Sequence, residues 1–80
     1  MNQIEQRAAS VMSIILNIPI SEISMEATQD NYSTWDSLKH LDLVVALEEE
    51  FDISIPEEEI GNLLSLKLIA LIIQECLNAK

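Results

Sequence analysis

One glycine and two prolines divide this 80-residue chain into segments in which apolar residues recur every three or four positions. That spacing places them on one side of an α-helix, whereas few runs alternate apolar and polar residues as strands do. Hydrophobic residues make up 49% of the chain, so each helix has an apolar side to bury. The pattern predicts an all-α fold, a small four-helix bundle with three longer helices and one short one. The length fits a single domain, residues 1–80.

The first two helices are separated by a long loop. The first helix is expected over about residues 3–17, and Pro19 should end it, because the residue before a proline is disfavoured in the α region. The second should begin at Asp36 or Ser37, with Asp36 as its N-cap, and end near Phe51.

The loop covers about residues 20–35, is rich in Ser, Thr, Asn and Asp, and shows no clear period. It is long for a connection in so small a domain, so we expect it to pack on the helices. Trp35, near its end, should either hold the loop on the bundle or border the position of Ser37.

A short third helix is expected over about residues 56–60. Ser54 and Glu57 have the spacing of a capping box, and Pro56 is tolerated in a first turn. Gly61 should end this helix.

The last helix is expected over about residues 66–77, with Ser65 as its N-cap. Cys76 lies on it among apolar residues, which favours a small core side chain over a reactive thiol. A single cysteine allows no internal disulfide and fits a reducing compartment, so we expect a cytoplasmic protein.

The chain carries 14 acidic and 4 basic residues, a net charge of −10. Nucleic acids and anionic membrane surfaces are therefore disfavoured as partners, because binding phosphate requires Lys and Arg. No apolar run is long enough for a membrane span, and the N-terminus lacks the features of a secretory signal. We expect a monomer that meets basic patches on other proteins. The alternative is that the acids only keep a small domain in solution.

The second helix has apolar residues on two sides. At roughly 100° per residue, one side carries Leu43, Val44, Leu47 and Phe51, which we assign to the core. Nearly opposite lie Leu38, Leu41 and Val45, with Asp42 and Glu49 along one edge and Glu48 along the other. A bundle helix buries only one face well, so this narrow stripe is a candidate docking face for a partner with an apolar groove and a basic rim. The alternative is that the long loop covers the stripe as ordinary core.

Ser37 should stand in the first turn of this helix with its side chain clear of the core. The unpaired backbone N–H groups and the positive end of the helix dipole favour an attached or bound anion there. The alternative from the residues alone is a capping or solvated serine. Ser37 and His40 do not suggest a catalytic pair, because a helix-borne pair lacks an oxyanion hole. No metal site is expected, since His40 has no Cys or His partner.

The stretch DSLKHLDLVVALEEEFDISIPEEE resembles the acyl carrier protein family. The matching features are Asp36-Ser37-Leu38 opening a helix, alternating apolar and acidic residues, an acidic run ending in Phe51-Asp52, and Ile55-Pro56 before a short helix. The resemblance implies that Ser37 carries a covalent phosphopantetheine, added from coenzyme A by a separate phosphopantetheinyl transferase. The thiol of that arm would hold acyl groups as thioesters, and the bundle can also shelter an acyl chain between its helices.

The resemblance also implies partners: acyl-loading and acyl-modifying enzymes of fatty-acid or related biosynthesis, with basic patches. The residues expected to meet them are Asp36, Leu38, Leu41, Asp42, Val45, Glu48 and Glu49. In this interpretation the protein is a carrier and not an enzyme.

Two features depart from housekeeping fatty-acid carriers. Those usually have a small, glycine-containing stretch before Asp-Ser-Leu, where this chain has Ser33, Thr34 and Trp35. Lys39 stands where they commonly show an acid. Both departures suggest a specialised carrier with its own enzymes. Two alternatives stay open: a free-standing peptidyl carrier charged with an amino acid, and an unmodified acidic helical module that docks a basic partner.

Overall fold

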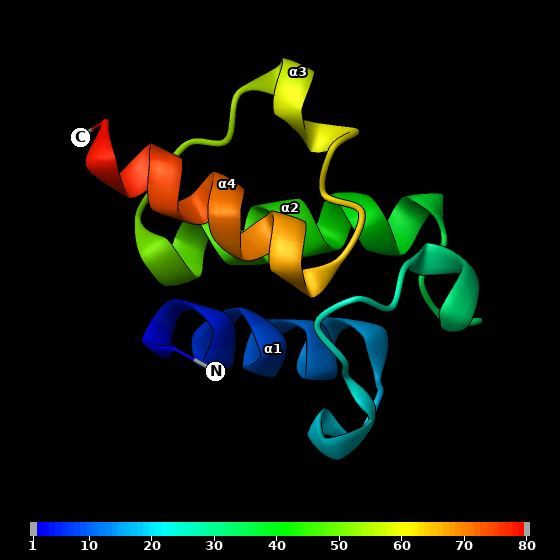
Figure 1. Ribbon diagram of the computed structural model, residues 1–80. Helices are drawn as coiled ribbons and strands as arrows, with labels where there is room; N and C mark the ends of the chain where they lie inside the picture. Colours follow the sequence, from blue (N-terminus) through cyan, green and yellow to red (C-terminus); the bar gives the residue numbers. More distant parts are fainter. Residues whose placement is uncertain (1, 80) are drawn as a thin grey trace.

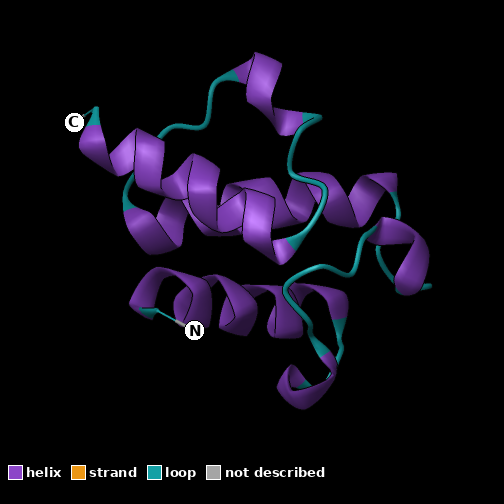
Figure 2. Cartoon of the chain, in the orientation of Figure 1, coloured by secondary structure: helices purple, strands orange, loops and turns teal. Residues whose placement is uncertain are grey.

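The computed structural model describes residues 2–79. Within them the elements are α1 (Gln3–Leu16), η1 (Ile20–Glu22), η2 (Gln29–Asn31), α2 (Ser37–Phe51), α3 (Glu57–Ile60) and α4 (Leu66–Asn78), where η marks a 3₁₀ turn. The helices α1 and α2 run antiparallel, and α1 packs against both α2 and α4, while the short α3 stands at the edge of the bundle (Figure 1). Figure 2 shows helices joined by loops and no strand in the part of the chain that is drawn in detail. The predicted all-α fold is confirmed.

The core is aliphatic and is shared by the three longer helices. Its fully buried large side chains are Met12, Leu16, Leu43, Leu47, Leu63, Leu66, Ile69 and Ile73. The assignment of one side of α2 to the core is confirmed, because Leu43, Val44, Leu47 and Phe51 are all buried. The Arg7 guanidinium lies 4.4 Å from the centre of the Phe51 ring and pairs with Glu50 at 2.9 Å, which ties α1 to the end of α2.

The long connection between α1 and α2 packs on the helices, as expected. Ile23 and Trp35 are buried in the common core. The backbone of the connection is also bonded to the start of α4, because the N–H of Lys67 donates to the carbonyl of Met25 at 3.0 Å. The segment therefore has a fixed path across the bundle that leads to the beginning of α2.

The end of α1 is set by Asn17 rather than by Pro19, so the predicted cause was wrong. Asn17 adopts a left-handed conformation, with φ 56° and ψ 48°, and its N–H donates to the carbonyl of Ser13. The helix therefore ends before Ile18, the residue whose α conformation Pro19 disfavours. Asparagine is one of the few residues that tolerate this conformation at a helix C-terminus.

The predicted capping box at the start of α3 was also wrong. Pro56, with φ −57° and ψ 141°, is the N-cap, and it has no side chain that can accept a hydrogen bond. The helix therefore begins at Glu57, one residue later than expected. Just before it, the N–H of Ile55 donates to the Glu48 carboxylate at 2.8 Å, so a residue of α2 fixes this turn. Gly61 follows the last residue of α3, as expected, in a right-handed conformation.

Ser65 is the N-cap of α4, as predicted, and its Oγ accepts a hydrogen bond from the N–H of Leu68 at 3.3 Å. The isolated bridge between Ser65 and Thr28 places the long connection beside the N-terminus of α4. The helix ends at Asn78, one residue beyond the expected end.

Candidate functional site

Ser37 is the first residue of α2 and its side chain is exposed. Asp36, in an extended conformation, is the N-cap, and its Oδ1 accepts a hydrogen bond from the N–H of Lys39 at 2.9 Å. Within residues 2–79 the Ser37 hydroxyl has no hydrogen-bond partner. Because Asp36 already caps the helix, Ser37 is not a capping serine, and its hydroxyl is open to solvent.

Three segments that are distant in the sequence meet around this hydroxyl. Ser37 lines a shallow hollow of about 330 Å³ together with Gln29, His40, Leu41, Gly61 and Leu64. These residues come from the long connection, from α2, and from the turn between α3 and α4. The walls next to Ser37 are therefore partly aliphatic, provided by the two leucines.

The position of Ser37 is held by a hydrogen-bonded link through His40. The buried Trp35, 2% exposed, donates from Nε1 to His40 Nδ1 at 3.0 Å. His40 Nε2 lies 2.9 Å from the carbonyl oxygen of Ile60. A neutral imidazole that accepts at Nδ1 carries its proton on Nε2, so it donates to Ile60. His40 thus connects the long connection, α2 and α3.

This link decides two predictions and adds one feature that sequence reasoning missed. Trp35 holds the loop on the bundle, the first of its two predicted roles. Both nitrogens of His40 are occupied, so the imidazole does not serve Ser37 as a base. The pairing of Trp35 with His40 was not predicted. The sequence did contain a signal for it, because the indole donor of Trp35 precedes the imidazole of His40 by five residues, across the start of a helix.

The second apolar stripe of α2 is exposed and is not covered by the long connection. Leu38, Leu41 and Val45 are 75%, 56% and 55% exposed, respectively. We call these three residues the exposed stripe. Asp42 and Glu49, beside it, are exposed as well.

Two of the predicted docking acids are engaged within the fold. Glu48 is half-buried and its carboxylate accepts from the N–H of Ile55, so it fixes the turn after α2. Asp36 is exposed, but one of its carboxylate oxygens caps the helix. The acids that stand beside the exposed stripe without such a bond in residues 2–79 are Asp42 and Glu49.

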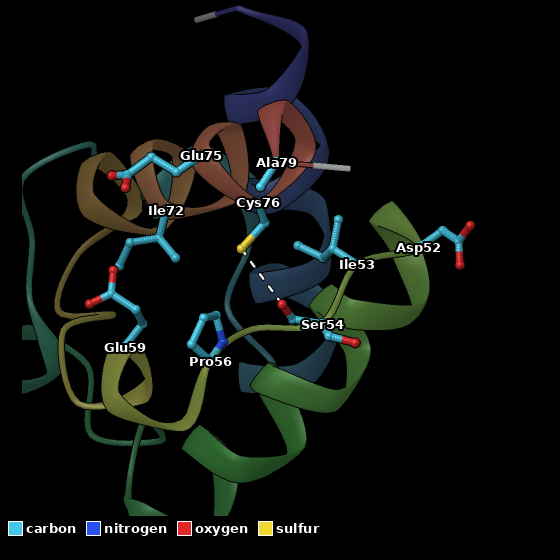
Figure 3. Close-up of a pocket in the computed structure, with 9 residues that line it drawn as sticks. All are labelled: Asp52, Ile53, Ser54, Pro56, Glu59, Ile72, Glu75, Cys76 and Ala79. Atoms are coloured by element: carbon cyan, nitrogen blue, oxygen red, sulfur yellow. Dashed lines mark hydrogen bonds between the residues drawn. The ribbon is translucent and has the colours of Figure 1, made fainter.

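A cavity of about 570 Å³ lies at the other end of α2, away from Ser37 (Figure 3). Its lining includes Ile53, Pro56, Ile72 and Cys76, with acidic residues at its edge, and the Cys76 thiol lies 3.7 Å from the carbonyl oxygen of Ser54. Burial raises the pKa of the Cys76 thiol, and the charges of Glu75, Glu59 and Glu48 raise it further. A raised pKa keeps the sulfur protonated and a poor nucleophile, so the volume of this cavity does not mark a reactive site.

Within residues 2–79, no three His, Cys, Asp or Glu side chains gather in a way that could hold a metal ion. Among the described helices, none combines the length and the apolar character needed to cross a membrane.

The sequence matches no family model. It is similar to the acyl carrier protein of Buchnera aphidicola subsp. Schizaphis graminum (strain Sg), with 39% identity over 59 residues. The similarity covers 74% of this chain and 75% of that relative. The aligned region thus spans about three quarters of each sequence. The all-helical fold with an exposed serine at the start of α2 agrees with the resemblance in the DSLKHLDL stretch. The chain belongs to the acyl carrier protein family.

Proposed function

We propose that this protein carries acyl groups as thioesters on a phosphopantetheine arm attached to Ser37, and presents them to enzymes of fatty-acid or related biosynthesis. The observation that carries the proposal is the Ser37 hydroxyl, exposed at the first position of α2 and without a hydrogen-bond partner within residues 2–79. The arm, when attached, supplies the thiol at which an acyl group is held. The side chains of the protein bind, orient and present, and none of them needs to react with the cargo.

The start of α2 fits a covalently attached phosphodiester. Asp36 occupies the N–H of Lys39, while the backbone N–H groups of Ser37 and Leu38 have no acceptor within residues 2–79. Two unpaired donors and the positive end of the helix dipole stabilise a negative charge at this position. The ammonium group of Lys39, in the same turn and exposed, adds a positive charge that offsets the nearby Asp36 carboxylate.

The hollow beside Ser37 fits the beginning of an attached chain. Leu41 and Leu64 give it apolar walls, and this hollow of about 330 Å³ is open to solvent rather than enclosed within the core. His40 and Gly61 complete its lining. Because the Trp35–His40–Ile60 link holds these segments together, the hollow keeps its shape next to the hydroxyl.

The exposed stripe and its acids fit the partners of a carrier. Leu38, Leu41 and Val45 offer apolar contact, and Asp42 and Glu49 offer negative charge to enzymes with basic patches. Charge complementarity of this kind raises association rates and selects partners more than it raises affinity. A phosphopantetheinyl transferase must approach the same end of α2, so it is the first partner that we propose.

Intact-mass measurement tests the attachment. The protein is incubated with coenzyme A, Mg²⁺ and a phosphopantetheinyl transferase of broad specificity, and it should gain the mass of one phosphopantetheine. Ser37→Ala should gain nothing, whereas Ser33→Ala, which removes an exposed serine of the neighbouring loop, should gain as the wild type does. A folded wild-type protein that gains no mass would support the unmodified interaction module instead.

A second reaction on the modified protein distinguishes an acyl cargo from an amino-acid cargo. A ligase that loads fatty acids onto carrier thiols, and an adenylating enzyme that loads amino acids, are each offered the same sample with ATP. Loading by the fatty-acid ligase supports the acyl carrier, and loading by the amino-acid enzyme alone supports the peptidyl carrier.

A further inference from the structure

Ile14 is the most exposed large hydrophobic side chain of the described chain, at 79%. It lies near the C-terminal end of α1, and because it is so exposed it contributes little to the core of the bundle. Beside it runs a groove of about 320 Å³ between α1 and α2. This α1–α2 groove is lined by Val11, Ile14, Ile15, Ala46, Glu49 and Glu50.

The groove and the exposed stripe lie on either side of the same acids. Around α2, at about 100° per residue, Glu49 and Asp42 lie about 20° and 40° from Leu38. Ala46, which lines the groove, lies at about 80° in the same direction. Leu41 and Val45 lie on the other side of Leu38. The acids Asp42 and Glu49 therefore form a row with apolar surface on both sides, rather than the outer rim of one apolar stripe.

The charges of the groove are not all compensated within the fold. Glu50 pairs with Arg7 at 2.9 Å, and the Arg7 side chain also donates to the Glu50 carbonyl at 2.7 Å. Asp42 and Glu49 have no basic partner within residues 2–79. The acidic row is thus available to positive charge from another molecule.

We infer that the docking surface of this protein extends across the acidic row onto α1, so that a partner enzyme places Lys or Arg on Asp42 and Glu49 and an apolar side chain against Ile14 in the α1–α2 groove. This inference rests on the proposed carrier function, because it concerns the enzymes that meet the modified protein. The required partner surface is a basic ridge with apolar side chains on both sides. A second copy of this chain does not fit, since two surfaces of a molecule with net charge −10 repel each other.

The test compares two alanine variants of exposed helix residues. Ile14→Ala removes the apolar contact of the groove, and Leu71→Ala removes a 53%-exposed leucine from α4 as the matched control. Alanine is the best helix former, so neither change should disturb folding. Each variant is first converted to the phosphopantetheine form, verified by intact mass, and then loaded by the fatty-acid ligase under steady-state conditions.

We expect Ile14→Ala to lower kcat/KM of loading about tenfold through KM, the value of a partly buried isoleucine contact, while Leu71→Ala matches the wild type. In a second measurement, ¹⁵N-labelled modified protein is titrated with the ligase, and the amide signals of Val11, Ile14 and Ala46 should shift with those of the exposed stripe.

The inference is overturned if Ile14→Ala is loaded as the wild type is, if both variants lose equally, or if the α1 amides stay unshifted while those of α2 respond. Dimers in sedimentation that Ile14→Ala abolishes would overturn it as well, because a second copy would then occupy the groove. Each of these results leaves the mass gain at Ser37 untouched, so failure here is distinguishable from failure of the proposed function.

Discussion

Replacing His40 by alanine should destabilise the protein strongly, although the residue lies next to the functional serine rather than in the centre of the core. The change removes the hydrogen bond to the Ile60 carbonyl, worth about 1 kcal/mol, and leaves the buried Nε1–H of Trp35 without its acceptor, which costs about 1–2 kcal/mol. The expected loss is therefore about 2–3 kcal/mol. A chain of this length has about 4–12 kcal/mol of stability in total, so the loss is a large fraction.

The assay is urea and thermal unfolding of the unmodified protein, followed by circular dichroism. A loss of this size should lower Tm by roughly 10–20 °C, at about 4–8 °C for each kcal/mol in so small a domain. A double-mutant cycle with Trp35→Phe, which keeps an aromatic ring but removes the N–H, isolates the contact from the loss of packing. The cycle should give a coupling of about 1 kcal/mol. Additive single effects would refute the link between Trp35 and His40.

Two further predictions concern surfaces that behave in opposite ways. Val45→Arg places a positive charge on the exposed stripe, so turnover by a loading enzyme should fall at least tenfold. The Tm should change by less than about 3 °C, because the side chain is not part of the core. Unfolding of this variant would instead assign Val45 to the core. Cys76 of the unmodified protein should be alkylated at pH 8 more slowly than a free cysteine, because its raised pKa reduces the thiolate fraction, and the rate should recover in urea. Equal rates in the folded and unfolded protein would contradict the burial of that thiol.

Much of α2 could be predicted from the sequence, because periodicity alone decides which residues of a helix share a face. The core side with Leu43 and Leu47, the exposed side with Leu38 and Val45, and the cap at Asp36 all follow from local rules. The exposed hydroxyl of Ser37 follows instead from its place at the first position of α2, because periodicity alone sets Ser37 only about 20° from the buried Val44.

The features that were missed depend on contacts between distant segments or on backbone angles. The contact of His40 with the Ile60 carbonyl joins residues 20 positions apart, and no spacing rule predicts it. The capping box at Ser54 failed because Pro56 itself became the N-cap, while Glu48, seven residues away, bonded the N–H of Ile55. The α1–α2 groove was missed for a similar reason, because it appears only when Ile14 and Ala46 are brought together.

The central claim, that Ser37 bears the prosthetic arm, is tested most directly by locating the added group on the wild-type chain. After reaction with coenzyme A and the transferase, the protein is digested and the fragments are sequenced by tandem mass spectrometry. The account predicts one phosphopantetheine, on the fragment that contains Ser37 and at that residue. A group found on any other serine, or a folded protein that stays unmodified after complete conversion of a control carrier, would contradict it.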